Sequence, residues 1–436
     1  MTGKTVGIVG GGITGLALAH YLDRHDVDVA LFEATPDPGG VIRSGRVDGS
    51  VVEWGPQRVR RTDRIDGLIG DLDLESEVRT AAPDLPVCVY ADGDLHPAPF
   101  SPSAFASTDL LSAEAKREVL AEPFTEPASP DETAAELFAR KFGAETYRKL
   151  LGPLFGGIYG SDPAEMPVGH ALSGLVALER RDGSLLKTAI GRTAGGRDAP
   201  PAISFDDGLQ RLPEALADAH ADAVRLGTPV TAVRERVGVD EPGGPTYELE
   251  TAEGSTAVEQ VVLTTRADLT ADLLADLASA SVGSLRELTY NPFATAYLRA
   301  DLEGEGEVDP AALGYQVGFD ADLRTLGASW NASMFDRDVY SVFLGGMHDP
   351  EVLDESDDRI GEIAAAEFET VTGAPAEVVD VHRLERGFPA YDDSWAALDR
   401  VDTPTGVRLA TNYTARMGVP SRIREAASLA EELADS

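Results

Sequence analysis

The sequence predicts an α/β protein whose core is a parallel β-sheet that begins at the N-terminus. Three observations favour this class. Residues 4–32 show a strand, a glycine turn, a helix and a second strand in close succession, which is the order of a β-α-β unit. Segments with strand and helix periodicity continue to alternate along the rest of the chain. The length of 436 residues is sufficient for two domains.

The composition indicates a globular protein without membrane spans or disulfides. Hydrophobic residues make up 43% of the chain, and no segment approaches the roughly 18 uncharged apolar residues of a membrane helix. The N-terminal apolar stretch is short, is broken by glycines and lacks a cleavage site, so we expect no signal peptide. Cys88 is the single cysteine, which excludes an internal disulfide and a CxxC motif. We expect a cytoplasmic protein without a metal site, and peripheral membrane contact stays open.

The charge balance is strongly acidic. The chain has 75 acidic and 37 basic residues, for a net charge of −38 at pH 7. Such a surface repels the phosphates of nucleic acids, so we expect no nucleic-acid partner. An acidic docking face would also produce this charge. The excess runs along the whole chain, however, which favours a surface adapted to high salt.

The N-terminal unit carries a complete nucleotide-binding pattern. Residues 4–9 predict a buried strand, residues 14–25 a helix, and residues 27–32 a second strand. In the turn between the first strand and the helix, Gly10 allows the tight bend, and Gly12 lets the backbone approach a pyrophosphate. Gly15 lets the helix pack closely on the strand, and the free N–H groups of the helix N-terminus face the phosphate charge.

An acidic residue completes the pattern at the end of the second strand. Glu33 is expected to accept hydrogen bonds from ribose hydroxyls, and its charge disfavours a 2′-phosphate. A glycine turn without a ligand is the alternative, but the strand, helix and acidic residue all stand where the motif requires them. The expected cofactor contacts of this unit are Gly10, Gly12, Ile13, Thr14, Gly15, Glu33 and Ala34.

Two segments that follow favour FAD over NAD. Residues 38–44 (PGGVIRS) resemble the second FAD motif of the amine oxidase and protoporphyrinogen oxidase superfamily, in which a Gly-Gly pair and an arginine lie along the phosphates. Residues 48–56 resemble the stretch of that family that ends in a Gly-Pro turn beneath the flavin. The resemblance implies cofactor contacts from Gly39, Gly40, Val41, Arg43, Gly55 and Pro56.

The middle of the chain supplies the expected substrate side. Residues 87–97 predict a hairpin, and residues 110–120, 133–142 and 144–151 predict amphipathic helices. Residues 153–163 (PLFGGIYGSDP) resemble a porphyrinogen oxidase segment of the form P-L-x-x-G-[IV]-[YF]-[AG]-x-D-P. Residues 191–202 lack periodicity and are expected to form a mobile loop.

The family pattern continues in the second half of the chain. Residues 205–216 resemble the stretch that re-enters the FAD domain, and Val230 stands where the family contacts the adenine side through its backbone. Residues 264–267 (TTRA) depart from the usual A-T-P-A sequence and place Arg266 near a cofactor-facing turn. Further strands are expected at 285–300, 314–319, 328–331 and 341–344, and a helix at 357–372.

The C-terminal segments resemble those that close the flavin site. Residues 387–391 followed by Trp395 are similar to a P-x-Y motif with a flavin-contacting aromatic residue. Residues 416–423 (RMGVPSRI) resemble the G-V-G-V-P-D-C-I motif, in which a helix N-terminus faces the flavin ring. Ser421 and Arg422 replace its Asp-Cys pair, but the contact runs through the backbone, so Met417, Gly418 and Val419 keep that role.

The order of these motifs is that of protoporphyrinogen and coproporphyrinogen oxidases, and the resemblance runs from residue 4 to about 430. It implies an α/β fold with a discontinuous Rossmann-type FAD-binding domain and an inserted α+β substrate-binding domain. The expected FAD-binding domain comprises residues 1–80, 204–284 and 384–436. The expected substrate-binding domain comprises residues 81–203 and 285–383.

The implied reaction is the oxidation of a porphyrinogen, either protoporphyrinogen IX or coproporphyrinogen III, to the porphyrin in haem biosynthesis. A carbon of the reduced tetrapyrrole gives hydride to non-covalently bound FAD, and oxygen reoxidises the flavin. The protein supplies positioning and electrostatics, so no catalytic residue is assigned and none of His96, His170, His348 and His382 is given a role.

Three other functions stay open at this point: an amine oxidase, a carotenoid-type desaturase or isomerase, and a non-catalytic FAD-binding protein. Amine oxidases of the superfamily carry a lysine on the strand that corresponds to residues 290–300, and this stretch contains none. They also usually hold the amine in an aromatic cage, and no tight Tyr/Trp pair is evident at 391–395. Propionate groups on a substrate would need arginines as partners. Arg58, Arg60 and Arg61, which follow the Gly55-Pro56 turn, could be these partners or could be surface residues. Some family members carry an arginine where Val87 stands, which leaves the choice of porphyrinogen open.

Overall fold

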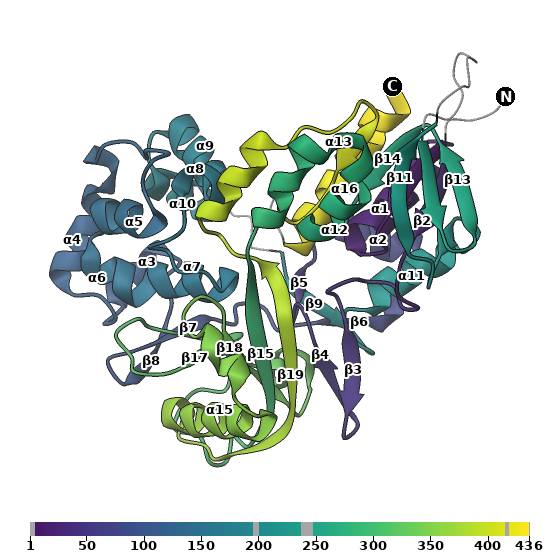
Figure 1. The fold of residues 1–436 in the computed structure, drawn as a ribbon. Coiled ribbons are helices and arrows are strands. Elements are labelled where there is room, and N and C mark those ends of the chain that lie inside the picture. Colours follow the sequence, from purple (N-terminus) through teal and green to yellow (C-terminus); the bar gives the residue numbers. More distant parts are fainter. Residues whose placement is uncertain (1–4, 195–199, 237–246, 415–417, 436) are drawn as a thin grey trace.

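The fold is described here from a computed structural model, which describes residues 5–194, 200–236, 247–414 and 418–435. It consists of a parallel-sheet part, a seven-stranded sheet and a cluster of helices (Figure 1). The parallel sheet has the strand order β10-β2-β1-β14-β20. Its strands are β1 (Thr5–Val9), β2 (Asp28–Phe32), β10 (Val224–Arg225), β14 (Gln260–Leu263) and β20 (Val407–Leu409).

Helices and a small antiparallel sheet cover the two faces of the parallel sheet. One face packs against helices from distant parts of the sequence: α1 (Ile13–Asp23), α2 (Asp63–Asp71), α11 (Arg211–Ala219) and α16 (Val419–Asp435). The C-terminal helix α16 lies along α1, as Figure 1 shows. The other face carries β11 (Val230–Glu235), β12 (Tyr247–Thr251), β13 (Gly254–Val258), α12 (Ala267–Leu273), α13 (Ala275–Val282) and the 3₁₀ turn η4 (Gly283–Glu287).

Short strands connect the parallel sheet to the rest of the molecule. One hairpin is formed by β3 (Ser44–Val47) and β4 (Ser50–Glu53). A second small sheet joins β5 (Val59–Arg60), β6 (Val78–Thr80), which follows the 3₁₀ turn η1 (Glu75–Glu77), and β9 (Ala202–Phe205). Strand β9 returns from the helical cluster and lies between β5 and β6, so it ties three distant segments together.

The seven-stranded sheet has the order β19-β15-β18-β17-β16-β7-β8. Its strands are β7 (Val87–Ala91), β8 (Asp94–Pro97), β15 (Tyr290–Ala300), β16 (Gly314–Val317), β17 (Thr325–Ser329), β18 (Tyr340–Gly345) and β19 (Ala376–Pro389). Two short helices border it, α14 (Asn331–Phe335) and η5 (Pro350–Asp354). The 3₁₀ helix η6 (Asp393–Arg400) follows β19 and packs against η4. The long strands β15 and β19 run side by side up to the parallel-sheet part (Figure 1).

The two faces of this sheet differ. Helix α15 (Asp357–Thr372) covers the outer face, where alternate residues such as Ala296, Tyr315 and Val342 form a closed apolar core. By the same alternation, Phe293, Thr295, Tyr297, Gln316, Ser329, Ser341 and Phe343 belong to the inner face. This inner face is the more polar of the two.

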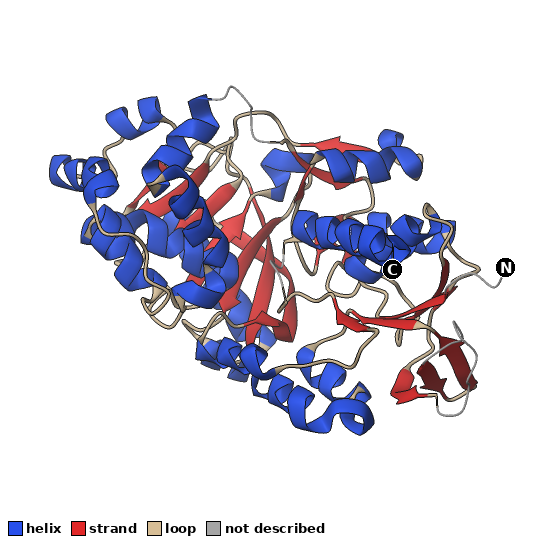
Figure 2. Cartoon of the chain, turned by 90° about the horizontal axis from the view of Figure 1, so that it is seen from above, coloured by secondary structure: helices blue, strands red, loops and turns tan. Residues whose placement is uncertain are grey.

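The helical cluster lies beside the seven-stranded sheet, as Figure 2 shows from above. It comprises α3 (Pro102–Ser107), α4 (Ala113–Ala121), η2 (Glu122–Phe124), α5 (Ala134–Phe142), α6 (Ala144–Thr146), the π-helical turn η3 (Tyr147–Leu151), α7 (Gly152–Tyr159), α8 (Val168–Ala171), α9 (Ser173–Asp182) and α10 (Leu185–Ala194). Thr133 begins α5 with a capping box, in which its side chain and that of Glu136 each accept an N–H of the first turn.

One expectation about this cluster is refined and one was wrong. Residues 144–151 do not form one α-helix, because the chain passes into a π-helical turn at Tyr147 and then continues as α7. Residues 191–194 were expected in a loop but complete α10, while β9 begins at Ala202. Residues 195–199 of that expected loop lie outside the described residues. The domain boundaries given above stay a prediction.

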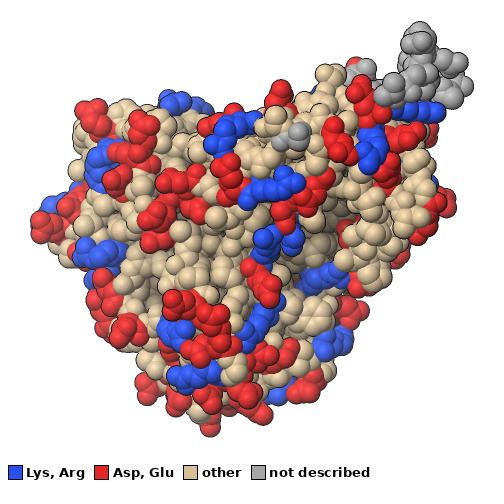
Figure 3. Space-filling view, viewed as in Figure 1, with Lys and Arg blue, Asp and Glu red and all other residues tan. Residues whose placement is uncertain are grey.

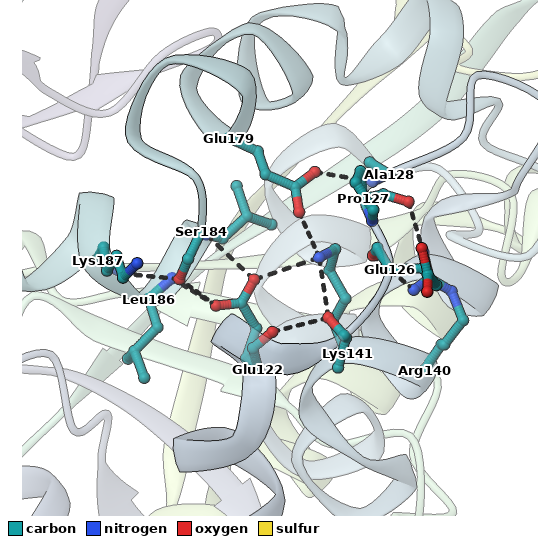
Figure 4. Close-up of polar contacts among 12 residues, drawn as sticks. Glu122, Glu126, Pro127, Ala128, Arg140, Lys141, Glu179, Ser184, Leu186 and Lys187 are labelled. Carbon is teal, nitrogen blue, oxygen red and sulfur yellow. Dashed lines mark hydrogen bonds and ion pairs between the residues drawn. The ribbon is translucent and has the colours of Figure 1, made fainter.

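Exposed charge and buried charge are arranged differently. On the face shown in Figure 3, acidic side chains are spread over the whole surface, with basic ones among them. Inside the helical cluster, Lys141 is fully buried and contacts two carboxylates, Glu122 at 3.3 Å and Glu179, and donates to Thr125 Oγ1 at 3.1 Å (Figure 4). Glu122 also accepts the N–H groups of Leu185 and Leu186, each at 3.1 Å. The network joins η2, α5, α9 and α10.

Candidate functional site

The glycine turn after β1 is held in a shape that its sequence requires. Gly10 has a φ of +114°, a conformation that favours glycine. Thr264 directly follows β14. Its hydroxyl donates to the carbonyl oxygens of Val9 and Gly10, which lie 3.1 and 3.0 Å from Oγ1. A Cβ on Gly15 would overlap the Gly10 carbonyl oxygen, so this glycine lets α1 start against the turn. The sequence pattern did not predict this contact of Thr264, because it depends on the neighbouring strand.

Gly12 differs from these two glycines. A Cβ at Gly12 would meet no atom within 4 Å, so the backbone borders open space. Gly12 is also the residue that precedes α1, and no side chain caps the first turn of that helix. The N–H groups of the first helical turn are therefore available to an anionic ligand. Ile13 and Thr14 belong to this turn, and their side chains are buried.

Glu33 is fixed by three hydrogen bonds but keeps acceptor capacity. Its Oε2 accepts the N–H of Gly11 at 2.7 Å. Its Oε1 accepts the N–H and the hydroxyl of Thr35, at 2.8 and 2.7 Å. A carboxylate has about four lone-pair sites, so one position on Oε2 stays available for a hydroxyl donor. The adjacent Ala34 is exposed.

The second glycine pair lies directly against the first turn. Gly39 donates its N–H to the Gly11 carbonyl at 2.8 Å, and a Cβ on Gly40 would lie 3.3 Å from the Cα of Gly12. Val41 follows with half of its surface exposed (50%), although it is apolar. A Cβ on Gly55 would overlap the Val41 carbonyl oxygen, so the Gly55-Pro56 turn packs directly against the backbone of Val41.

Arg43 lies on the same loop as Glu33. Its guanidinium lies 3.2 Å from the Asp37 carboxylate and donates to the carbonyl oxygens of Gly40 and Asp37, each at 3.3 Å. It also contacts Thr35 Oγ1 at 3.4 Å, and Thr35 in turn donates to Glu33. The arginine and the acidic residue are thus linked through one threonine.

These residues fit a dinucleotide cofactor. Four features of the segment from Gly10 to Pro56 point to this. They are the open space at Gly12, the uncapped N-terminus of α1, the remaining lone pair of Glu33 and the exposed apolar surface of Val41. Each of these features is a surface or polar group that a bound dinucleotide would satisfy.

The remaining predicted contacts come from other segments. Val230 begins β11 two residues after Thr228, whose N–H donates to the Glu33 carbonyl at 2.8 Å. Gly418 and Val419 stand at the start of α16, which packs along α1. Met417 lies outside the described residues. Trp395 is buried and donates its indole N–H to the Ala390 carbonyl at 2.5 Å, and no hydrogen bond or ring contact links it to the glycine turns among the described residues.

An aromatic stack at 391–395 corrects one sequence interpretation. Tyr391 and Trp395 form a close pair, with ring centroids 4.7 Å apart and planes 19° from parallel, and Tyr159 meets Tyr391 edge-on at 4.8 Å. The pair was missed because the intervening residues form the 3₁₀ turn of η6, which brings positions 391 and 395 together. Rings stacked at this distance leave no room for a ligand between them.

The inner face of the seven-stranded sheet meets the segment that contains Gly55-Pro56. Tyr297 donates its hydroxyl to the Glu53 carbonyl at 2.7 Å, and Trp54 stacks on His382 with centroids 5.5 Å apart. The buried Glu53 carboxylate contacts Arg337 at 3.0 Å and accepts the N–H of Leu209 at 3.1 Å. Burial raises the pKa of Glu53, and the Arg337 guanidinium opposes that shift. This junction fixes the sheet to the parallel-sheet part.

The arginines after Gly55-Pro56 have different environments. Arg61 forms ion pairs with Asp66 and Glu75, and the exposed Arg60 donates to the Pro200 carbonyl at 3.0 Å. The half-buried Arg58 donates to Ser329 Oγ on the inner sheet face at 3.1 Å. Burial, together with the nearby charge of Arg60, lowers the pKa of Arg58 to about 10. It therefore stays charged at neutral pH.

Other residues raised by the sequence are placed as follows. Arg266, which departs from the family pattern, pairs with Asp268 at 3.2 Å and points along α12. Burial lowers the pKa of His348 and of His382, so both are neutral at pH 7. Across the described ranges, no helix is long and apolar enough to cross a membrane. The same residues contain no group of His, Cys, Asp and Glu side chains that could hold a metal ion.

Comparison with known sequences identifies relatives over nearly the whole chain. The family described as flavin containing amine oxidoreductase matches residues 13–433. Protoporphyrinogen oxidase 2 of Arabidopsis thaliana is 24% identical, over 99% of this chain and 94% of that protein. Coproporphyrinogen III oxidase of Bacillus subtilis is 27% identical, over 89% of this chain and 87% of that protein.

Solved structures show the same fold. A crystal structure from Exiguobacterium sp. 255-15, provisionally named a protoporphyrinogen oxidase, superposes with a TM-score of 0.78 at 26% identity and covers 100% of this chain and 99% of that one. Putrescine oxidase with bound putrescine superposes with a TM-score of 0.71 at 14% identity, over 99% of each chain. The second likeness concerns the fold alone.

Proposed function

Because the chain belongs to the flavin containing amine oxidoreductase family and is an FAD-dependent oxidoreductase of the porphyrinogen oxidase type, we propose that it oxidises a porphyrinogen to the porphyrin. The substrate is protoporphyrinogen IX or coproporphyrinogen III, the reaction belongs to haem biosynthesis, and oxygen is the electron acceptor. The observation that carries this proposal is the likeness to curated porphyrinogen oxidases over 89–99% of the chain.

The parallel-sheet part provides the FAD site in this proposal. The turn at Gly10 and Gly12, the first turn of α1 with Ile13 and Thr14, and Gly40 bind the pyrophosphate. Glu33 accepts a ribose hydroxyl on its remaining lone pair. Arg43 adds positive charge beside Gly40, and the Gly55-Pro56 turn supports the ring system. When bound, FAD accepts the hydride that leaves the substrate.

The inner face of the seven-stranded sheet provides the substrate side. The Glu53–Arg337 junction and the Tyr297 hydrogen bond hold this face at a fixed position relative to Gly55-Pro56. Such fixed positioning is what a hydride transfer requires from the protein. Partial desolvation lowers the pKa of His348 and of His382, and neither is assigned a proton-transfer role.

Two observations argue against an amine as substrate. Strand β15, the long strand beside the edge strand β19, contains no lysine. The Tyr391–Trp395 pair is closed by stacking, so it does not form two walls around an amine. Both residues are also buried, at 5% and 6% exposure.

The test is to supply the purified, FAD-loaded protein with each porphyrinogen and with polyamines, first without oxygen and then in air. We expect loss of the oxidised flavin absorbance with a porphyrinogen, and porphyrin fluorescence once air is admitted. Reduction by polyamines but by neither porphyrinogen would overturn the proposal. Reduction by neither class would do so as well and would favour a desaturase.

A further inference from the structure

Arg58 stands where two parts of the molecule meet. It directly precedes β5, whose Val59 is buried in the core of the parallel-sheet part. Because side chains alternate along an extended strand, Arg58 points the opposite way, toward the seven-stranded sheet. Its Nη1 donates to Ser329 Oγ at 3.1 Å, and Ser329 is the inner-face residue at the end of β17.

The hydrogen-bonded side chains that connect to this guanidinium are neutral. Ser329 Oγ lies 3.3 Å from Asn331 Oδ1, and Asn331 Nδ2 donates to Ser341 Oγ at 3.0 Å and to Gln57 Oε1 at 2.9 Å. Gln57 Nε2 donates in turn to the Gly55 carbonyl at 2.9 Å. The chain of hydrogen bonds thus runs from Arg58 back to the Gly55-Pro56 turn without meeting a carboxylate.

The guanidinium has more donors than this network uses. An arginine has five N–H donors, and Ser329 Oγ is the one acceptor of Arg58 among the residues that the structure describes. Among the described residues no carboxylate forms an ion pair with it, and the charge that acts on it is that of Arg60, although the protein has 75 acidic residues. The nearby Arg60 adds repulsion. The half-buried charge is therefore uncompensated, which is costly unless an anion is bound.

The position also matters for a substrate. Ser329 pairs with Gly314, and Gly314 pairs with Val87, so these residues share one row across the inner face. Some family members carry an arginine at the position of Val87, but valine supplies no positive charge to this row. Arg58 supplies one to the same row from a different segment of the chain.

We propose that Arg58 binds a carboxylate group of the porphyrinogen on the inner sheet face. This inference rests on the proposed function and names the residue that recognises the acidic side chain of that substrate. A planar guanidinium suits a carboxylate because two of its N–H groups can bind both oxygens together. In the proposed function the FAD phosphates bind at Gly10 and Gly12, so the carboxylate that we assign to Arg58 is that of the substrate.

The experiment measures binding of a porphyrin to the oxidised, FAD-loaded protein, once as the free acid and once as the methyl ester. Fluorescence quenching gives each Kd for the wild type, R58Q, R58K and R61Q. R61Q is the matched control, since Arg61 is a nearby arginine whose partners Asp66 and Glu75 are internal. FAD content and melting temperature are recorded for every variant.

We expect the wild type to bind the free acid roughly tenfold to a hundredfold more tightly than the ester, which is the range for one charged hydrogen-bonded pair. R58Q should lose this preference, R58K should keep part of it, and R61Q should keep all of it. In turnover, R58Q should raise KM for the free acid by a similar factor and leave kcat within about twofold.

Two outcomes would overturn the inference while leaving the proposed function in place: R58Q retains the preference for the free acid, or it loses FAD. Failure of the proposed function has a separate signature, because the wild-type flavin would then be reduced by neither porphyrinogen. If the wild type also binds no porphyrin, both proposals fall.

Discussion

Lys141 and Arg58 are both shielded from bulk solvent, but they differ in whether carboxylates of the protein neutralise their charge. Lys141 in the helical cluster contacts two carboxylates and a hydroxyl from its own chain (Figure 4). Arg58 contacts one hydroxyl and no carboxylate among the described residues. A buried charge that its own chain compensates stabilises a fold, whereas one that is left uncompensated is a candidate for ligand binding.

The glycines of the nucleotide-binding turn show the same contrast. Gly15 is packed so closely that a Cβ would overlap the Gly10 carbonyl oxygen, while Gly12 borders empty space. Substitution at Gly15 should therefore disturb the fold, and substitution at Gly12 should disturb only the ligand. Open space and unsatisfied polar groups distinguish the proposed ligand-binding positions from the structural ones in both regions.

The largest expected effect is at this turn. Gly12→Val should abolish FAD binding, because the new side chain fills the space that the pyrophosphate needs. The flavin absorbance of the purified protein reports the loss, and acid precipitation of the wild type should release all of its flavin. The cofactor-free protein should melt at the same temperature with and without Gly12→Val. A variant that keeps full FAD content would remove Gly12 from the site.

The next effect concerns stability. Lys141→Met leaves two buried carboxylates without their cation and should lower the free energy of unfolding by about 3–5 kcal/mol. Chemical denaturation measures the change, and the exposed Lys187 on α10 provides the control, since Lys187→Met should have little effect. A loss below about 1 kcal/mol would show that the network does not stabilise the cluster.

Salt separates exposed charge from buried charge. With a net charge of −38, the melting temperature of the wild type should rise as KCl is added, because screening at 1 M salt acts over about 3 Å instead of about 10 Å at 0.1 M. The stability difference between Lys141→Met and the wild type should stay within about 1 kcal/mol across the same series. A melting temperature that does not respond to salt would mean that the acidic surface has another purpose.

The smallest expected effect is the stability change at Arg58. Arg58→Met removes one hydrogen bond to Ser329 and also removes an uncompensated charge, so the two contributions oppose each other. The free energy of unfolding of the cofactor-free protein should change by less than about 1 kcal/mol. A loss as large as that of Lys141→Met would show that Arg58, like Lys141, has a structural partner and stabilises the fold.

The sequence predicted the parts of this molecule that depend on local pattern. The β-α-β unit and helix α15 follow from periodicity and glycine spacing, and α15 has the expected bounds.

Contacts between distant segments could not be predicted in the same way. Thr264 holds the Gly10 turn only because β14 lies beside β1, and Arg58 differs from Arg60 and Arg61 only because β17 lies opposite it. The Tyr391–Trp395 stack required a 3₁₀ turn that the sequence pattern does not specify. Such contacts depend on strand order and register, which a single sequence does not reveal.

The most direct test of the account is one anaerobic titration. Purified, FAD-loaded protein in KCl is mixed with coproporphyrinogen III or protoporphyrinogen IX, and the oxidised flavin absorbance is followed through the first turnover. We expect that at least one of the two substrates abolishes this absorbance and that R61Q behaves like the wild type. A flavin that stays oxidised with both substrates, but is reduced by a polyamine, would contradict it.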